Sequence, residues 1–547
     1  MTLISLITIF SLILVLIRKN IYFLFLWQKK EYRFDKFLDL VRSPKFSAVF
    51  LDWFTIFRLL CFLLLIYWFQ FSILTINLIL IASLLEVLLF TYQVIRKRAL
   101  LPKFTVKLSL IVALTIALNS LIASALITPN LTAGSYVNYG GWNIMVFVIA
   151  ITLIQSILLT PVIIGLVIFI LTPIDLILKS RIAYTAKLKR LNNPDLKVIG
   201  ISGSYGKSST KEILFQLLST NYKVERTFKN HNSTLAVARR IINLSTDIQF
   251  FLSEIGAYRK GDGYDQCKFS LPNTSIITGL NNQHYALFGG KKQIIEGESE
   301  SLEFLKKGDT AIINWDSKWC HEIVVPKGIK VLKYGFSKDA NLRAEIVKTS
   351  LSGTVFKVFW QDQVFNLKTN LASTGNIQNI LASLACCLVH NLDLNSKEIS
   401  KTLLNLTTPE GTLQIQPIEK GYIIDDSYNA NLDGVLNALE LLKNCKEDKV
   451  LVLDDIIELG QESVVSHLKI AESINLINPS LVILVGKDYS KLIQEYLIEN
   501  GFPAVNIIQA DPKNINPIHK AIKSIKSKQT IFLFEGFNSR KYFQIAK

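Results

Sequence analysis

Residues 197–213 read KVIGISGSYGKSSTKEI, an apolar run that gives way to glycines, a lysine and hydroxyls. The run Val198–Ile201 has the composition of a buried strand, and the residues from Ser208 onward favour a helix. Between them, Gly203 and Gly206 permit a tight turn that exposes backbone N–H groups near the positive end of that helix. The strand, turn and helix together predict a phosphate-binding loop.

Two side chains carry the chemistry of such a loop. Lys207 would neutralise the β and γ phosphates of a nucleoside triphosphate, and the Ser208 hydroxyl would bind Mg²⁺. The spacing is G-x-x-G-K-S in place of the commoner G-x-x-x-x-G-K-[ST], so the loop is a variant. A glycine-rich surface turn with a solvated lysine is the alternative interpretation. The predicted ATP-binding residues of the loop are Gly203, Ser204, Tyr205, Gly206, Lys207, Ser208 and Ser209.

The positive charge of the chain is concentrated before the loop. The protein has 547 residues and a net charge of +17. Residues 1–192 hold 19 Lys and Arg against 6 Asp and Glu, so 13 of the 17 charges lie in this apolar N-terminal part. Basic loops beside apolar spans are typical of the cytoplasmic side of a membrane. Nucleic-acid binding therefore loses its main support, and we expect no nucleic-acid partner.

Five apolar stretches predict a transmembrane anchor in residues 1–192. Most of them are near or beyond the ~20 residues that cross a bilayer. No Lys or Arg precedes the first stretch, so we expect a short span closed by Arg18 and Lys19, not a cleaved leader. Residues 21–27 would then be interfacial. The stretches are residues 2–17, 54–70, 73–95, 105–128 and 143–172.

The loops between these stretches decide the orientation. Loops 18–53, 96–104 and 177–192 carry the basic residues, whereas residues 129–142 carry no charge. Basic loops remain in the cytoplasm. The sequence therefore predicts a multi-pass protein of the cell membrane, with its N-terminus outside and everything after residue 177 in the cytoplasm.

Glu86 lies inside the third apolar stretch. A carboxylate at that depth is a candidate for function, although a protonated or helix-paired structural residue is the alternative. We expect no second acidic or basic residue within the spans. A transport path therefore has little support.

A second domain is predicted at residues 193–407, where short apolar strands alternate with amphipathic helices. This pattern favours a parallel sheet with helices on both faces. The strand in IQFFLSEIGA ends at Glu254, and the strand in TSIITGL leads to His284. Ligands collect at the carboxyl ends of such strands, so Glu254 should emerge beside the loop and hold Mg²⁺. Taken alone, the two residues could equally be a surface acid and a structural histidine.

A third domain is predicted at residues 408–547. Apolar runs in GYIIDDSYNANLDG, KVLVLDDIIELG, SLVILVG and TIFLFEG are typical of strands that end in polar turns. We expect a compact Rossmann-like unit. The predicted fold class is therefore multi-domain, with an α-helical transmembrane region, an α/β P-loop domain and an α/β Rossmann-like C-terminal domain.

Eight short motifs follow one another along the chain: SGSYGKSSTKE (202–212), SEIGA (253–257), ITGLNNQHYALFG (277–289), IIEGESESL (294–302), AIINWD (311–316), STGNIQNILA (373–382), DDSYNAN (425–431) and LVLDDIIELG (451–460). Each is weak alone, but in this order they make the chain from about residue 195 onward resemble the Mur ligases. The resemblance implies an ATP-dependent carbon–nitrogen ligase of the acid–amino-acid type that uses ATP and Mg²⁺. Such an enzyme joins a peptidoglycan precursor of the cell wall to an amino acid or a dipeptide such as D-alanyl-D-alanine.

The resemblance also implies roles for individual residues. Lys207 would contact the phosphates, Ser208 and Glu254 would hold one Mg²⁺ ion, and His284 would help to place a second. An ordinary turn rich in Asp and Asn would look similar at residues 425–431. Further ATP contacts are implied for Asn376, Asn379, Asp425 and Tyr428, and substrate contacts for Asn230, Asn232, Asn429, Asn431, Glu458 and His467.

The chain departs from the family pattern at a metal-binding position. Family members usually carry a carbamylated lysine two residues before a glutamate, and the corresponding residues here are Glu298 and Glu300. A glutamate is anionic like the carbamate but shorter. We therefore expect Glu298 to help bind the second metal ion and count it with the catalytic residues, while a solvated acidic helix face is the alternative.

Two further departures lie in the C-terminal domain. Thr412 stands where an arginine is usual, and Glu535 stands where a lysine is usual, although Arg540 follows closely. Nucleotide or substrate contacts are therefore expected to differ from those of the family.

The family's chemistry first phosphorylates a carboxylate to an acyl phosphate, which an amine then attacks. The sequence assigns no base to take the proton of the amine. Membrane spans replace the family's UDP-sugar-binding domain, so the acceptor would be a lipid-linked precursor or a soluble one held by fewer contacts. A nucleotide-binding membrane scaffold derived from a Mur ligase is the main alternative, and an ATP-driven transporter is a weaker one.

Overall fold

The computed structural model describes residues 3–543 except residues 31, 35–36, 39–51, 68–71, 97–98, 133–137, 140–141, 230, 429, 444, 511–515 and 526–528. The chain divides into two compact units, Met1–Leu178 and Lys179–Lys547. Helix α7 (Ile144–Leu191) runs through this boundary without a break. The predicted end of the anchor at residue 192 stays a prediction.

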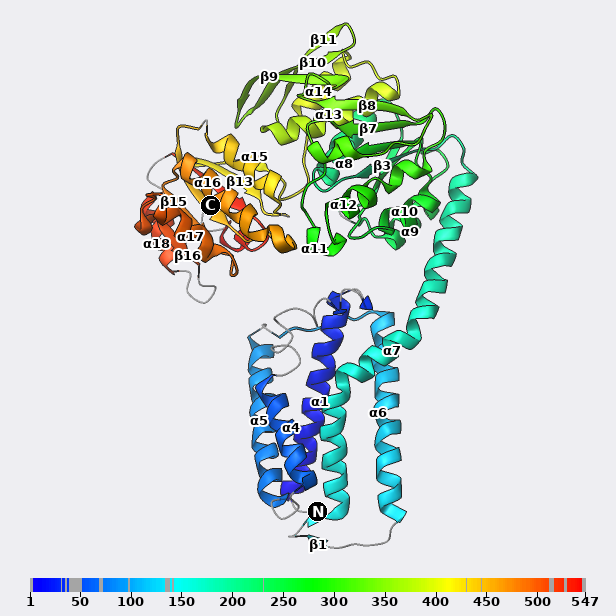
Figure 1. The fold of residues 1–547 in the computed structure, drawn as a ribbon, viewed down its shortest axis with the longest axis vertical. Helices are drawn as coiled ribbons and strands as arrows, with labels where there is room; N and C mark the ends of the chain where they lie inside the picture. Colours follow the sequence, from blue (N-terminus) through cyan, green and yellow to red (C-terminus); the bar gives the residue numbers. More distant parts are fainter. Residues whose placement is uncertain are drawn as a thin grey trace. The chain divides into compact units, whose positions relative to one another are not determined.

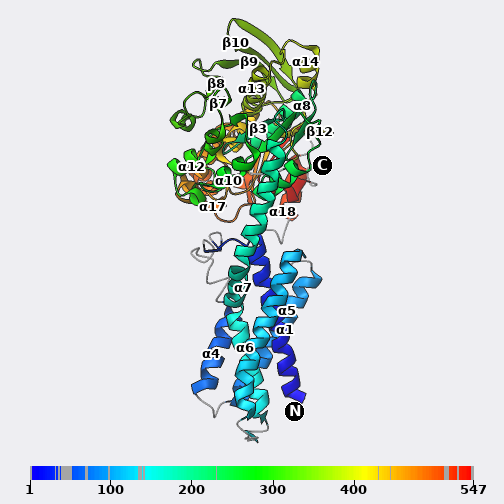
Figure 2. The ribbon, with the colours of Figure 1, turned by 90° about the vertical axis from the view of Figure 1, so that its right-hand side faces the viewer.

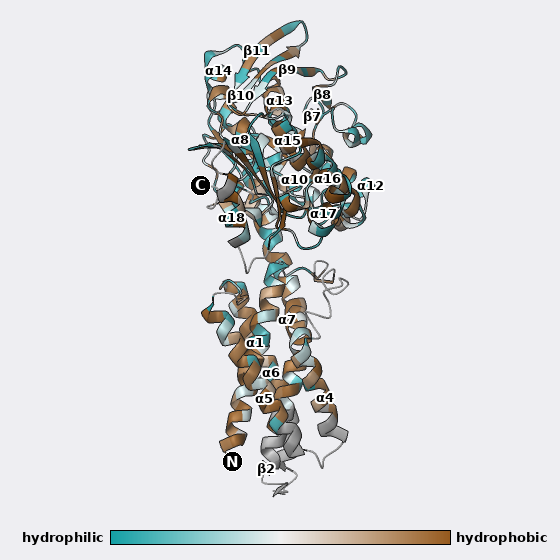
Figure 3. Ribbon diagram, turned by 90° about the vertical axis from the view of Figure 1, so that its left-hand side faces the viewer, coloured by the Kyte–Doolittle hydropathy of each residue, from teal (hydrophilic) through white to brown (hydrophobic). Residues whose placement is uncertain are grey.

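The first unit consists of long helices that run alongside one another (Figures 1 and 2). Apolar residues predominate along these helices (Figure 3). Among the described residues, three helical segments are long and apolar enough to cross a membrane, namely Leu6–Lys29, Asn77–Ile95 and Thr152–Leu191. The anchor of five spans stays a prediction. The elements of this unit are α1 (Leu3–Lys29), α4 (Trp53–Tyr67), α5 (Ser72–Ile95), α6 (Val106–Thr132), β1 (Asn138–Tyr139), β2 (Trp142–Asn143) and the first part of α7.

The structure corrects two expectations about charges in these helices. Glu86 has charged partners, because its buried carboxylate forms ion pairs with Arg18 and with the fully buried Arg58, which lies inside the predicted span 54–70. Helix α1 also does not end at Arg18 and Lys19. It continues to Lys29, and both cations have acidic partners: Glu86 of α5 for Arg18, and Asp52, which precedes α4, for Lys19 at 2.6 Å.

The second unit begins with a nine-stranded sheet in the order β11-β10-β9-β8-β7-β6-β3-β5-β4. Strand β3 lies between β5 and β6 and runs parallel to both, with Ile201 level with Glu254 and Ser202 level with Ile277. The carboxyl ends of these three strands therefore meet at one edge. The strands are β3 (Lys197–Ser202), β4 (Val224–Arg226), β5 (Phe250–Glu254), β6 (Thr274–Ile277), β7 (Thr310–Asn314), β8 (Lys330–Gly335), β9 (Leu342–Ser350), β10 (Gly353–Trp360) and β11 (Gln363–Thr369).

The sheet is mixed, which corrects the prediction of a parallel one. Strands β9, β10 and β11 pair antiparallel through short turns. Their side chains alternate between buried and exposed, as in β11, where one face is covered and the other meets solvent. An alternation of apolar and polar residues within 342–369 is the sequence pattern that predicts these antiparallel strands.

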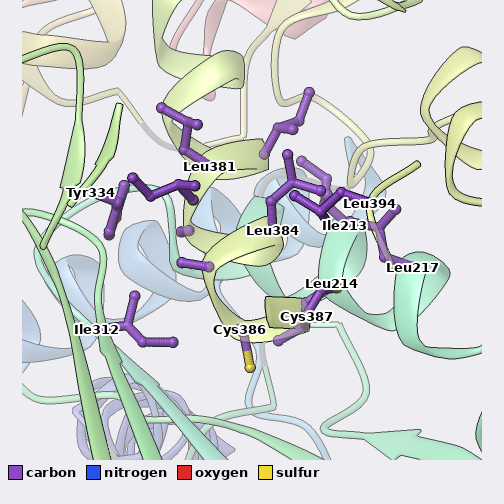
Figure 4. Packing of buried hydrophobic residues seen from close by; sticks show 14 of the residues in the cluster. Ile213, Leu214, Leu217, Ile312, Tyr334, Leu381, Leu384, Cys386, Cys387 and Leu394 are labelled. Carbon is purple, nitrogen blue, oxygen red and sulfur yellow. The ribbon is translucent and has the colours of Figure 1, made fainter. Parts of the chain in front are cut away.

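Helices cover both faces of the central sheet, as predicted. Ile199 and Ile201 of β3 pack with α8 and α13, whereas Val198 packs on the opposite face with α9. Figure 4 shows the first of these cores, in which Leu214 and Leu384 lie between the two helices. The helices are α8 (Lys207–Leu218), α9 (Thr234–Ile242), α10 (Asp262–Ser270), α11 (Tyr285–Phe288), α12 (Lys291–Glu298), α13 (Thr374–Val389) and α14 (Lys397–Leu404).

The C-terminal part is a six-stranded sheet in the order β12-β13-β17-β14-β15-β16. All pairs are parallel except β12 with β13. The four predicted strands are present, and β12 and β16 are additional. Its elements are β12 (Gln414–Ile418), β13 (Gly421–Asp426), α15 (Leu432–Lys443), β14 (Asp448–Leu453), α16 (Ser463–Ile477), β15 (Leu481–Leu484), α17 (Ser490–Glu499), β16 (Ile507–Gln509), α18 (Asn516–Ile525), β17 (Thr530–Glu535) and the 3-10 helix η6 (Ser539–Tyr542).

The buried ion pairs of Glu86 lead to a prediction about stability. Glu86→Gln keeps the shape of the side chain but leaves two arginines without a counter-charge, which we expect to cost about 3 kcal/mol or more. Thermal unfolding of the detergent-solubilised protein measures this loss. Asp175→Asn is the matched control, because its partner Lys107 and Asp175 itself are about one-third exposed, and a loss under about 1 kcal/mol is expected. Equal losses in both variants would contradict a structural role for Glu86.

Candidate functional site

The phosphate-binding loop lies between the end of β3 and the start of α8 and is closed against its neighbours. Gly206 caps α8 in the left-handed conformation, with φ of 76°. A Cβ atom there would lie 2.5 Å from Asn379 Oδ1, and one at Gly203 would lie 2.4 Å from Thr278 Oγ1. Both positions therefore favour glycine, because the loop backbone has a positive φ there and packs closely against Thr278 and Asn379.

The first residues of α8 face a pocket beside this loop. The Lys207 ammonium donates a hydrogen bond to the carbonyl oxygen of Gly203. Ser208 Oγ lies 3.0 Å from both carboxylate oxygens of Glu254, at the end of β5. The N–H groups of the first helical turn have no partner within the helix and confer positive potential on this end.

Glu254 is the centre of a buried polar cluster. Its side chain accepts hydrogen bonds from Ser208, from Asn232 Nδ2 at 3.2 Å and from Lys211 Nζ at 2.9 Å. Lys211 is fully buried and also donates to the carbonyl oxygen of Lys229. The cluster holds a carboxylate and a hydroxyl side by side, and such hard oxygen ligands suit Mg²⁺.

These groups line a pocket of about 690 Å³ between the central and C-terminal sheets. The structure brings most of the predicted site residues to its wall. Those that line it are Ser204, Tyr205, Gly206, Lys207, Ser208, Ser209, Asn232, Glu254, His284, Asn376, Asn379, Tyr428, Asn431 and Glu458.

His284 joins the two sides of the pocket. Its Nδ1 atom lies 2.6 Å from Glu458 Oε2, although the two residues are 174 positions apart. Both have a positive φ, 58° for His284 and 67° for Glu458, which is a strained conformation for residues with a Cβ atom. A hydrogen bond of 2.6 Å from Asn281 Nδ2 to Asp433 Oδ2 adds a second bridge.

Glu298 lies elsewhere than the sequence predicted. Its buried carboxylate accepts hydrogen bonds from Ser202 Oγ at 2.6 Å and from the Gly203 N–H at 2.9 Å, and it is absent from the pocket lining. It is not a solvated helix face either, since it is 1% exposed. In this position the side chain fixes the start of the phosphate-binding loop from behind.

Four other predicted residues need comment. Asp425 is buried against Ser427, and the next residue along β13, Asp426, lines the pocket in its place. His467 is buried outside the pocket, where Nε2 accepts from the Ile456 N–H at 3.1 Å and Nδ1 donates to a backbone carbonyl. Burial lowers the pKa of His467, which suits this neutral, structural arrangement. Asn230 and Asn429 lie outside the described residues.

The sequence reasoning missed several functional candidates. Lys211 follows Lys207 by four residues on α8, so the helical period already placed both on one face. Tyr258 and Phe537 also line the pocket, and the sequence carries no comparable signal for them.

The residues present fit ATP and Mg²⁺. Lys207 and the first turn of α8 present positive charge to the pocket, and Ser208 with Glu254 supplies oxygen ligands. Among the described residues, no group of three His, Cys, Asp or Glu side chains could hold a metal alone. Any Mg²⁺ here would therefore need phosphate oxygens or water as further ligands.

Comparison with known proteins agrees with this geometry. The family described as the Mur ligase middle domain matches residues 201–387. Over those residues the chain resembles a Mur ligase middle domain. The chain is also 29% identical over 295 residues to the UDP-N-acetylmuramoyl-tripeptide–D-alanyl-D-alanine ligase of Buchnera aphidicola, and 27% identical over 294 residues to that of Escherichia coli. These matches span 53% of this chain and 63% and 65% of the respective relatives.

Solved structures show the same fold. A crystal structure of MurF from Acinetobacter baumannii matches with a TM-score of 0.60 and 24% identity, over 67% of this chain and 79% of that one. MurF ligase from Thermotoga maritima, solved in complex with ADP, matches with a TM-score of 0.58 and 23% identity over 67% of this chain and 83% of that one. At these identities the likeness concerns the fold alone.

The position of Glu298 yields a prediction that separates its two possible roles. In Glu298→Gln an amide oxygen can still accept the bonds from Ser202 and Gly203, so we expect ATP affinity and turnover within a few-fold of the wild type. Glu298→Ala leaves two buried donors unsatisfied, at about 1–3 kcal/mol each, and should weaken ATP binding at least about tenfold. Titration with a fluorescent ATP analogue measures the affinity of both variants, and phosphate release measures their turnover. Abolition of turnover by Gln alone would instead support the predicted role as a metal ligand.

Proposed function

We propose that this protein is a membrane-attached, ATP-dependent ligase that forms an amide bond on a peptidoglycan precursor. The observation that carries the proposal is the arrangement at the pocket: a glycine-rich loop with Lys207, the Ser208–Glu254 pair and His284 at the ends of three adjacent parallel strands. The similarity to UDP-N-acetylmuramoyl-tripeptide–D-alanyl-D-alanine ligases supports the type of reaction.

Each part of the pocket has a role in this proposal. Lys207 and the N-terminus of α8 bind the triphosphate, while Ser208 and Glu254 supply oxygen ligands to a Mg²⁺ ion, which would neutralise charge on the phosphates. Asn376 and Asn379, on the first turns of α13, lie at the nucleotide side of the pocket. Lys211 is a positioning residue, because its ammonium holds the Glu254 carboxylate from the buried side.

The proposed reaction has two steps. The carboxylate of the precursor attacks the terminal phosphorus of ATP, which gives an acyl phosphate and ADP. An amine then attacks the acyl carbon, forming the C–N bond as phosphate leaves. Both steps concentrate negative charge near Lys207, so catalysis depends mainly on electrostatic stabilisation by fixed donors.

The names of the relatives support a proposal for the substrates. The amine would be an amino acid or a dipeptide, of which D-alanyl-D-alanine is the example named for the relatives. The acid would be a muramoyl-peptide precursor. Because apolar helices precede the ligase domains, we propose that the precursor is lipid-linked and reaches the pocket from the cytoplasmic face of the membrane.

This function predicts a specific biochemical result. The purified full-length protein, given ATP, Mg²⁺, muramoyl-tripeptide in UDP-linked or undecaprenyl-linked form and D-alanyl-D-alanine, should release phosphate and make the amide seen by mass spectrometry. Lys207→Ala should lower the rate about 10²–10³-fold, because it removes a fixed charge at the phosphates. Lys292→Ala, at an 83% exposed side chain, is the control and should leave the rate unchanged.

Two results would contradict the ligase. ATP binding without phosphate release for any acid and amine pair would favour the nucleotide-binding scaffold. A rate of phosphate release that does not depend on the amine would favour coupling of ATP hydrolysis to another process.

Membrane attachment makes a separate prediction. The protein should remain in the membrane pellet after alkaline carbonate extraction. A membrane-impermeant maleimide should label Ser135→Cys in intact cells, because loop 129–142 is expected outside. It should label Lys292→Cys only after permeabilisation, since the ligase domains are expected in the cytoplasm. Release by carbonate, or the reverse labelling pattern, would contradict the proposed topology.

A further inference from the structure

The last three turns of helix α7, residues 179–191, belong to the second unit and are fixed to the central sheet by one face. Ala186 is fully buried and packs in the same cluster as Val198 of β3. One turn further on, the guanidinium of Arg190 donates a hydrogen bond of 2.9 Å to Asn273 Oδ1. The helix therefore cannot rotate about its axis without losing these contacts.

The opposite face of this helix carries large apolar side chains. Tyr184, Leu188 and Leu191 follow one another at helical spacing, about half a turn away from Ala186. They are 64%, 42% and 52% exposed, respectively. Single apolar residues on a surface are ordinary, but a continuous row along a helix indicates a partner that covers it. We call these three residues the apolar stripe.

Basic side chains flank the apolar stripe. At about 100° per residue, Arg181 and Lys187 lie on either side of it. Residues 176–194 contain no Asp or Glu, and neither cation forms an ion pair with another described residue. An apolar row between basic residues is the pattern of a helix that lies in the plane of a membrane interface.

The chain that precedes this helix indicates that a bilayer is close to the stripe. Helix α7 contains the segment Thr152–Leu191, which is long and apolar enough to cross a membrane. Its 40 residues make a helix about 60 Å long, whereas the hydrocarbon core is about 30 Å thick. Even a strongly tilted helix of this length leaves one part outside the core. Pro173 lies within the helix and removes one backbone hydrogen bond, which permits a bend there.

We propose that the apolar stripe, together with Arg181 and Lys187, binds anionic phospholipid headgroups of the cytoplasmic leaflet. This inference rests on the proposed membrane attachment. The apolar side chains enter the interface, while the long stems of the two cations let their charged ends reach lipid phosphates. Because Ala186 fixes the other face of the helix to β3, this contact holds the central sheet and its phosphate-binding loop at the membrane surface.

Fluorescence quenching in lipid nanodiscs tests the proposal. The full-length protein carries a bimane label on Leu188→Cys, with Cys445→Ser as background because the other five cysteines are buried. In discs that contain phosphatidylglycerol, a lipid with a nitroxide near its headgroup should quench the label, and aqueous acrylamide should not. The same label on Val347→Cys, at a 59% exposed residue of β9, is the control and should be quenched by acrylamide alone.

The flanking charges set the size of the effect. A basic residue near an anionic surface strengthens binding about fivefold, so Arg181→Gln with Lys187→Gln should weaken the surface contact about 25-fold and abolish the lipid quenching. Higher salt should weaken the contact as well, through screening. Lys292→Gln with Lys491→Gln removes the same charge at side chains that are 83% and 82% exposed, and should leave the quenching unchanged.

Four results would overturn the proposal. Equal lipid quenching in discs of phosphatidylcholine alone would remove the requirement for anionic headgroups. Quenching of the Leu188→Cys label by acrylamide alone would make the stripe a solvated helix face. Protection from both quenchers would mean that a protein partner or a second copy of the chain covers it. Failure of the protein to enter the discs would instead refute the membrane attachment itself.

Discussion

The parallel register of β5 and β6 on either side of β3 is the constraint on which the site depends. It brings the residues that follow three separate strands to one edge of the sheet. Ser208, at the start of α8, can then contact Glu254 at the end of β5. The hydroxyl of Thr278, after β6, can donate a hydrogen bond to the carbonyl oxygen of Ser202. Without that register, Gly203 and Gly206, Glu254 and His284 would lie in three separate loops with no reason to be close together.

Each buried charge around the loop has polar partners. Lys211 meets Glu254 on the helix side, and Glu298 receives the donors of Ser202 and Gly203 behind the loop. Each contact restrains a group that would otherwise have to be ordered when phosphate arrives, and preorganised donors are what make such sites effective. The first unit uses the same device in apolar surroundings, where Arg58 and Glu86 neutralise each other.

The sequence predicted those parts of the site that local rules govern. Strand, glycine turn and helix follow from short-range preferences, and Glu254 follows from its place at the end of an apolar strand. The sequence was less informative about side chains whose position depends on contacts between residues far apart in the chain. The choice between Asp425 and Asp426 depends on which face of β13 meets the pocket, and the burial of Glu298 depends on how α12 packs. His467 was predicted to contact substrate because its place after the ELG motif matches that of a histidine in the Mur ligases. Both of its ring nitrogens instead form hydrogen bonds with backbone groups.

Charged side chains of both signs line each wall of the pocket. The central domain contributes Lys207 and Glu254, and the C-terminal domain contributes Arg540 together with Asp426, Glu458 and Glu535. His284 and Glu458 connect the two walls through one short contact between two strained residues, so a change in that contact alters the width of the pocket.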